Sequence, residues 1–217
     1  MATSGTFTFR LTVDDMVTEA YERCGYRASQ LTQYDAESAR RSLNLMFTEW
    51  TVRGINYWTL EQDSITVTAG TSLYALDAGV LDIYSMVIRR DNSDTVMQRI
   101  GISDYNELPN KTQQGKPSSF MLDRQYTPQI YIWQTPDNST DQLIYWQMKQ
   151  LEDVTLANQD ADVPYRWTEA LCSGLAAKLA VKKRPELIPV LTPLAAEAFE
   201  QAATDERERA SLRINPA

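Results

Sequence analysis

The sequence of 217 residues contains no histidine and only two cysteines. Without histidine, the chain lacks the commonest general base, the Ser-His-Asp and Cys-His catalytic arrangements and the usual nitrogen ligand of zinc. Cys24 and Cys172 both fall in apolar helical patterns, which predicts buried free thiols and a reducing compartment. A Gly-rich phosphate loop and a GKS or GKT motif are also missing. We therefore expect no metal, no cofactor and no enzymatic activity.

Long apolar runs are lacking too. No stretch of about 18 apolar residues is present, so no membrane helix is expected. Residues 1–6 lack the basic start and apolar core of a secretory signal. The formal net charge is −8, which argues against a protein that grips nucleic-acid phosphates, because such binding needs a basic surface. An acidic protein can still surround DNA without holding it.

Helical periodicity marks the N-terminal part of the sequence. Apolar residues recur with helical spacing over 13–24 and again over 35–52, which predicts two helices packed as an antiparallel pair. Thr12 and Asp15 have the spacing of a capping box, with Asp in the place of Glu. Gly25 is expected to end the first helix.

Two further helices are expected near the C-terminus. The first begins around Pro164, and the second spans about 186–209 and is interrupted or kinked at its start by Pro189 and Pro193. Leu194 belongs to the apolar stripe predicted for that last helix. After Ala203 the pattern is charged on every face, so residues 205–217 form either a frayed tail or a tail that a partner orders.

Between the helical parts the period changes to two, which predicts strands. A strong strand is expected over Leu81–Arg90, followed by a polar hairpin turn at Asp91–Asp94. A short helix is expected over Ser103–Leu108, with Ser103 as its cap.

Two strands at the end of this region are apolar on both faces. In Gln129–Trp133, Ile130 and Ile132 point one way and Tyr131 and Trp133 the other. A second such strand, Gln142–Lys149, follows a turn, so the two are expected to pair as a hairpin. This hairpin lies either inside a two-layer core or with one aromatic face against another subunit. We predict that Tyr131 and Trp133 face the neighbouring subunit, since aromatic residues are enriched at interfaces.

The order of helices, strands and helices predicts an α+β fold. In this fold, a small helical bundle built from both chain ends carries an inserted antiparallel β lobe. The expected boundaries are an extended N-terminal arm at 1–12, a helical bundle at 13–56 and 163–204, a β lobe at 57–155 and a C-terminal tail at 205–217.

A series of short motifs resembles a known family. In chain order they are Leu43-Asn-Leu-Met-Phe-Thr-Glu-Trp50, Gly54-Ile-Asn-Tyr-Trp58, the Thr-Ala-Gly-Thr-x-x-Tyr turn at 68–74, Gly115-Lys-Pro117, Ile130-Tyr-Ile-Trp133 with Pro136, and Val163-Pro164. Their order and spacing over about 13–203 resemble the tail accessory factors of tailed bacteriophages, which are head-to-tail adaptor (connector) proteins.

This resemblance implies a structural role. Such adaptors form a ring, typically of twelve subunits, beneath the portal at the capsid vertex. The ring extends the DNA channel and provides a platform for the tail tube or nozzle. The implied partners are the portal protein, the tail tube or nozzle protein and further copies of the chain. Double-stranded DNA passes through without specific binding. The implied location is the virion, after synthesis in the host cytoplasm.

The resemblance also suggests site residues. Adaptors of this kind use C-terminal extensions to dock on the portal, which makes the tail a candidate. The polar turns of the β lobe are candidates for the tail-facing surface. The portal-contact candidates are Glu206, Arg207, Arg209, Leu212, Arg213 and Ile214, and the tail-facing candidates are Asp91, Asn92, Ser93, Asp137 and Asn138.

Two other functions stay open. One is a carboxylate-based cell-wall hydrolase of the virion, since Asp and Glu are plentiful although no pair stands out. The other is a monomeric adaptor module unrelated to phage.

Overall fold

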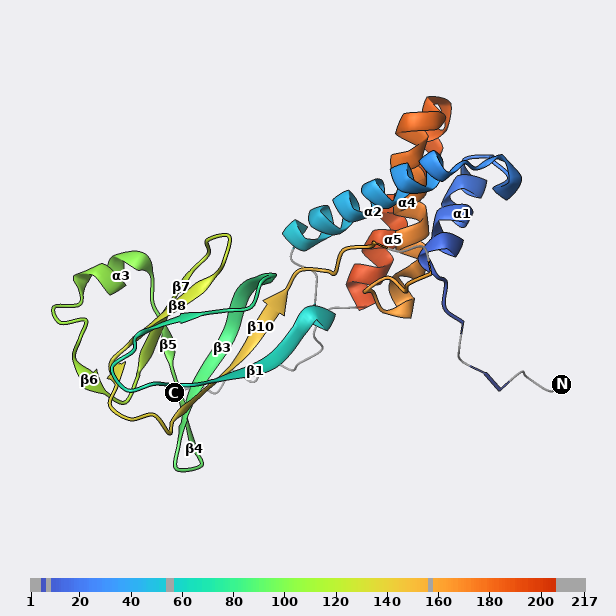
Figure 1. Ribbon diagram of the computed structural model, residues 1–217. Helices are drawn as coiled ribbons and strands as arrows, with labels where there is room; N and C mark the ends of the chain where they lie inside the picture. Colours follow the sequence, from blue (N-terminus) through green and yellow to red (C-terminus); the bar gives the residue numbers. More distant parts are fainter. Residues whose placement is uncertain (1–4, 7–8, 54–56, 156–157, 206–217) are drawn as a thin grey trace, which may run out of the picture. The chain divides into compact units, whose positions relative to one another are not determined.

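A computed structural model describes residues 5–6, 9–53, 57–155 and 158–205. The chain divides into two compact units (Figure 1). One is built from both chain ends, Met1–Ile55 with Leu151–Ala217, and the other from Asn56–Gln150. The first is helical and the second contains the strands, so the predicted α+β class is confirmed.

In the helical unit, one helix packs against the three others. Helix α4 contacts α1, α2 and α5. Short 3₁₀ turns precede or follow these helices at Ala28–Gln30, Tyr165–Trp167 and Pro185–Leu187. The helices are α1 (Val13–Arg23), α2 (Gln33–Arg53), α4 (Thr168–Lys183) and α5 (Ile188–Asp205).

The first two helices begin with the same hydrogen-bonded cap. The Thr12 hydroxyl donates to the Asp15 carboxylate at 2.7 Å and accepts from the Asp15 N–H at 3.3 Å, as predicted. Thr32 and Asp35 repeat this geometry at the start of α2, again at 2.7 and 3.3 Å. Helix α2 therefore begins at Gln33, two residues before the predicted start. The Thr-x-x-Asp spacing at 32–35 was the signal for this boundary.

The core of the helical unit is centred on Trp167, which is 0% exposed. Its ring centroid lies 5.1 Å from that of Trp50 and 5.4 Å from that of Phe199. A Cβ on Gly174 of α4 would lie 2.7 Å from the Sδ of Met46, so glycine permits the close approach of α2.

Helix α5 differs from its prediction in two respects. Pro189 lies in the first turn, where its missing N–H costs nothing, and the helix continues through Pro193. Leu194 was expected in the apolar stripe that faces the core, but its side chain is 51% exposed. The buried face of α5 is narrower than the apolar stripe, because α4 covers only the side that carries Phe199, Ala202 and Ala203.

Asp35 predicts a pH dependence of folding. An ion pair with Lys183 at 2.7 Å and hydrogen bonds from Thr32 lower the pKa of Asp35 to about 2. This is below the value of about 3.9 in an unfolded chain. The carboxylate therefore stabilises the fold above about pH 4, and this stabilisation is lost as the pH falls from about 4 to about 2.

We expect Asp35→Asn to lower the free energy of unfolding at pH 7 by about 1–2 kcal/mol, the usual cost of a weakened helix cap. The variant should also lose less stability than the parent between pH 4 and pH 2, as measured by thermal unfolding. Glu37→Gln, an exposed change on the same helix, is the control and should cost less than about 0.5 kcal/mol. Equal pH profiles for the parent and Asp35→Asn would contradict the assignment.

The β unit contains two four-stranded sheets and one two-stranded sheet. Their strand orders are β1-β10-β3-β4, β2-β8-β7-β5 and β6-β9. Most pairs are antiparallel, but β5–β7 and β6–β9 are parallel. The strands are β1 (Leu60–Thr66), β2 (Leu73–Ala75), β3 (Val80–Arg90), β4 (Ser93–Val96), β5 (Gln98–Arg99), β6 (Gln114–Gly115), β7 (Ser119–Asp123), β8 (Gln129–Trp133), β9 (Thr135–Pro136) and β10 (Gln142–Lys149).

The core of this unit takes side chains from both four-stranded sheets. Ile83 and Leu143 come from one sheet, Ile130 and Ile132 from the other, and each of these four is 0% exposed. The predicted burial is thus confirmed for one face of β8 and of β10, whereas Trp146 on the other face of β10 is 44% exposed. The predicted hairpin between them is wrong, because β8 pairs with β2 and β7, whereas β10 pairs with β1 and β3. Residues 134–141 cross from one sheet to the other.

Two local predictions have different outcomes. The turn between β3 and β4 is a two-residue turn with Asp91 at φ 51° and Asn92 at φ 60°, the left-handed geometry of a hairpin turn that Asp and Asn tolerate. The short helix α3 (Ile102–Glu107) begins before Ser103, so Ser103 is not its cap. Instead, the carboxylate of Asp104 accepts from the Gly101 N–H at 3.1 Å.

Candidate functional site

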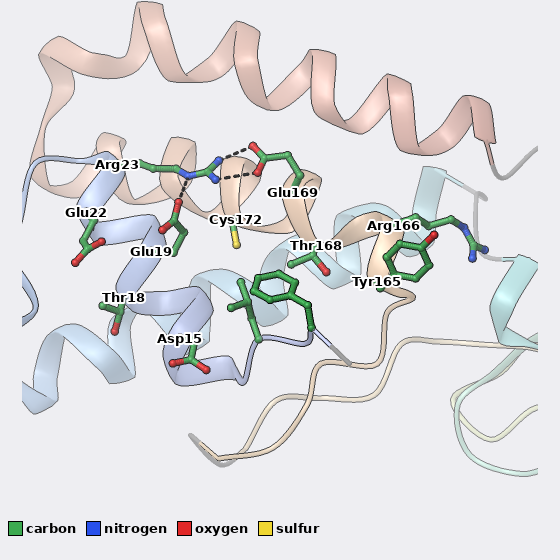
Figure 2. A pocket seen from close by; sticks show the side chains of 12 residues that line it. Asp15, Thr18, Glu19, Glu22, Arg23, Tyr165, Arg166, Thr168, Glu169 and Cys172 are labelled. Atoms are coloured by element: carbon green, nitrogen blue, oxygen red, sulfur yellow. Dashed lines mark hydrogen bonds and ion pairs between the residues drawn. The ribbon is translucent and has the colours of Figure 1, made fainter. Parts of the chain in front are cut away.

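A pocket of about 600 Å³ lies beside α1 and α4 in the helical unit (Figure 2). Arg23 reaches across it and binds two carboxylates, Glu19 at 2.8 Å and Glu169 at 2.7 Å. This ion pairing raises the pKa of Arg23 and lowers that of Glu169. Burial raises the pKa of the neighbouring Cys172 to about 11, so its thiol stays protonated and is a poor nucleophile at neutral pH.

This chemistry gives the hydrolase alternative no support. A glycosidase needs a carboxylic acid whose pKa is raised so that it can donate a proton. Among the described residues, every carboxyl group whose pKa clearly departs from its ordinary value has a lowered pKa. The described part of the chain also contains no group of three or more metal-ligating side chains.

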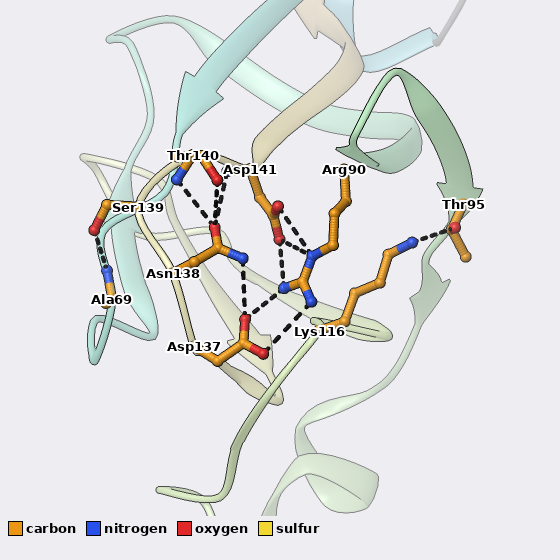
Figure 3. Close-up of polar contacts among 9 residues, drawn as sticks. All are labelled: Ala69, Arg90, Thr95, Lys116, Asp137, Asn138, Ser139, Thr140 and Asp141. Atoms are coloured by element: carbon orange, nitrogen blue, oxygen red, sulfur yellow. Dashed lines mark hydrogen bonds and ion pairs between the residues drawn. The ribbon is translucent and has the colours of Figure 1, made fainter.

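Three connections meet at one end of the β unit (Figure 3), and we call them the loop cluster. They are the β1–β2 connection at 67–72, the β3–β4 turn at 91–92 and the β9–β10 connection at 137–141. Antiparallel pairing brings them together, because the last residue of β1 pairs with the first of β10, which in turn pairs with Arg89 near the end of β3.

Arg90, the last residue of β3, links the β3–β4 turn to the β9–β10 connection. Its guanidinium binds Asp141, with an Nη2–Oδ2 distance of 2.7 Å and an Nε–Oδ2 distance of 2.9 Å. It also binds Asp137, whose pKa it lowers. Asp141 is only 1% exposed, so its charge depends on Arg90 for compensation, whereas Asp137 lies at the surface.

Hydrogen bonds of ordinary length order the β9–β10 connection and join it to the β1–β2 connection. Asn138 Oδ1 accepts from the N–H groups of Thr140 and Asp141, each at 3.0 Å. The Ala69 N–H donates to the Ser139 hydroxyl at 2.9 Å, which ties the first connection to the third. The loop cluster is therefore a pre-ordered polar surface.

The structure brings the tail-facing candidates together. Asp91, Asn92 and Ser93 follow Arg90 directly, and Arg90 contacts Asp137. Sequence reasoning missed Arg90 and Asp141, which organise the loop cluster. The one available signal in the sequence was that Asp141 comes directly before an apolar strand, while Arg89 and Arg90 end another strand.

The two intersubunit candidates lie on the outer face of β8. Tyr131 packs on Tyr105 of α3 with ring centroids 5.5 Å apart, and Trp133 donates its Nε1–H to the Asn110 carbonyl at 3.0 Å. Both side chains are half-buried by residues of their own unit. On β10, Trp146 points to the outer face of its sheet and is 44% exposed. The portal-contact candidates at 206–214 lie outside the described residues.

Comparison with protein families gives a match over nearly the whole chain. A family model described as SU10 adaptor protein matches residues 11–217. Comparison with curated proteins gives no match. Among the described residues, no helix is both long and apolar enough to span a membrane.

Proposed function

Because this chain belongs to the SU10 adaptor protein family, we propose that it forms a ring beneath the portal of a phage. The ring extends the DNA channel and gives the tail tube or nozzle its attachment surface. The observation that carries this proposal is the family match over residues 11–217. A net charge of −8 supports it as well, since an acidic channel wall repels double-stranded DNA and lets it pass.

The central experiment mixes the purified chain with the portal ring of its phage. We expect a stoichiometric ring-on-ring complex, visible by electron microscopy and native mass spectrometry, with twelve copies of the chain. A chain that stays monomeric beside the portal ring contradicts the proposal and favours the unrelated adaptor module. Turnover of peptidoglycan that is lost on single Asp or Glu changes would favour the hydrolase.

We propose that the loop cluster faces the tail. The support is its pre-ordered polar surface, in which Asp91 and Asn92 lie at an exposed hairpin end beside Ser93 of β4. Ser93→Arg places bulk and positive charge on an exposed strand position, and we expect it to reduce tail attachment at least about tenfold without changing the melting temperature. Infectious-particle titre and micrographs of tailless heads measure the effect.

The matched control is Thr127→Arg, an exposed change in the β7–β8 connection at the opposite end of β8. It should leave tail attachment unchanged. Normal attachment in Ser93→Arg, or equal loss in both variants, would argue against a tail-facing loop cluster.

We propose that the C-terminal tail docks on the portal. Its charged pattern over 205–217 suits no local core, and the resemblance implies this use. The candidate contacts are Glu206, Arg207, Arg209, Leu212, Arg213 and Ile214. Truncation after Thr204 should abolish portal binding in co-sedimentation while leaving the melting temperature unchanged. Retained portal binding by the truncated chain would refute the docking role.

A further inference from the structure

Helix α2 carries an apolar stripe on the face opposite its core contacts. Tyr34, Leu45 and Val52 lie on this stripe and are 66%, 66% and 83% exposed. Arg41 and Thr48 lie on the same line. Successive residues of the stripe, from Tyr34 to Val52, are therefore 7, 4, 3 and 4 positions apart in the sequence. Such spacing repeats every two turns and is typical of a helix face that packs against another helix.

Helix α5 carries a second stripe of this kind. Val190 and Leu194 are 59% and 51% exposed, and Glu197 and Gln201 continue their line with spacings of 4, 3 and 4 residues. This line lies opposite the buried face that carries Phe199. Among the described residues, no helix covers either stripe, although each exposes large apolar side chains.

The two stripes are complementary in charge. Arg41 is the charged residue of the α2 stripe, and no carboxylate among the described residues pairs with it. Glu197 is the charged residue of the α5 stripe, and helix α5 contains Glu197, Glu200 and Asp205 but no lysine or arginine. Among the described residues, no lysine or arginine forms an ion pair with Glu197, whose carboxylate accepts a hydrogen bond from Gln201, and Arg41 of α2 can supply such a partner.

We propose that the α5 stripe of one copy packs antiparallel on the α2 stripe of the next copy. With Leu194 opposite Leu45, the reversed spacing places Glu197 opposite Arg41 and Val190 opposite Thr48. Leucines then meet at the centre and the opposite charges meet one turn away. The inference rests on the proposed ring and names the surfaces that close it.

The arrangement suits a ring because the two stripes differ. A contact between two different surfaces is heterologous, so each copy keeps one free stripe after binding its neighbour, and rotation can close the chain of copies. A contact between two identical stripes would stop at a dimer.

Cysteine cross-linking tests the pairing directly. Cys24 and Cys172 are both buried, so new surface cysteines are the reactive ones. We expect the double variant Leu45→Cys with Leu194→Cys, treated with a short bis-maleimide on the assembled ring, to give a ladder of cross-linked multimers. Neither single variant should cross-link to another copy. A matched control combines Leu45→Cys with Leu73→Cys, an exposed leucine of the β unit, and should give no ladder.

Charge exchange provides the second test. Arg41→Glu and Glu197→Arg should each weaken assembly at least about tenfold in sedimentation, because each opposes like charges across the contact. The double variant should recover most of the loss. Both positions are exposed, so the melting temperature of the monomer should not change.

The outcomes separate this inference from the proposed ring. A ring on the portal that gives no ladder, or no recovery in the double reversal, overturns the α2–α5 pairing and leaves the ring intact. Cross-linking of Leu194→Cys alone to a cysteine of the portal protein also overturns it, because the α5 stripe then contacts the portal protein and not the α2 stripe. Absence of any ring with the parent chain refutes the proposed function itself.

Discussion

Replacing Arg90 by alanine is expected to lower the free energy of unfolding of the β unit by about 3–5 kcal/mol. The reason is Asp141, which is 1% exposed and has its carboxylate bound by the Arg90 guanidinium at 2.7 Å. Without Arg90 the carboxylate remains buried with no compensating charge. Hydrogen exchange of the β10 amides, followed across a urea titration, measures this unit separately from the helices.

The neighbouring arginine supplies the control. Arg89 pairs with Asp94 at 2.6 Å, but both side chains are more than 40% exposed. Arg89→Ala should therefore cost less than about 1 kcal/mol. Adding Asp141→Asn to Arg90→Ala should recover part of the stability, because it removes the buried charge. Equal costs for the two alanine variants would contradict a structural role for the buried pair.

The second large effect is expected in the helical unit. Trp167→Ala should destabilise that unit by about 3–5 kcal/mol, because it empties a fully buried site between Trp50 and Phe199. Hydrogen exchange of the α4 amides measures the loss. Because these helices supply the proposed contact between copies, assembly on the portal should fall as well.

Trp146→Ala in β10 is the matched change, since Trp146 is 44% exposed. It should cost less than about 1.5 kcal/mol, as expected for partial loss of apolar burial. A Trp167→Ala variant whose α4 amides exchange as slowly as those of the parent would show that the three rings do not hold the unit together.

Much of the local structure follows from the sequence. Helical spacing over 13–24 predicted α1, and the Thr12–Asp15 spacing predicted its cap, because a capping box forms between residues three apart. The turn at Asp91 and Asn92 was predictable for the same reason, since a two-residue hairpin needs residues that tolerate positive φ. These features depend on neighbours within about four residues.

The pairing of strands does not depend on such neighbours. The pattern of β8 showed that both faces need cover, and Ile130 and Ile132 are indeed fully buried. It could not show that β10 belongs to the other sheet, because any of several apolar strands in the chain could cover the same apolar face. The exposure of Leu194 could not be predicted from the sequence either, since periodicity does not show how much of an apolar stripe a neighbouring helix covers.

By itself the sequence determined the α+β class, the absence of histidine chemistry and the resemblance to phage adaptors, since all three depend on composition, local spacing and motif order. Only the tertiary structure decided that Arg90 and Asp141, 51 residues apart, organise the loop cluster. It also decided that no helix among the described residues covers the apolar stripes of α2 and α5. The physical reason is that ion pairing and burial arise when segments distant in the sequence pack together. One order of helices and strands is compatible with many such packing arrangements.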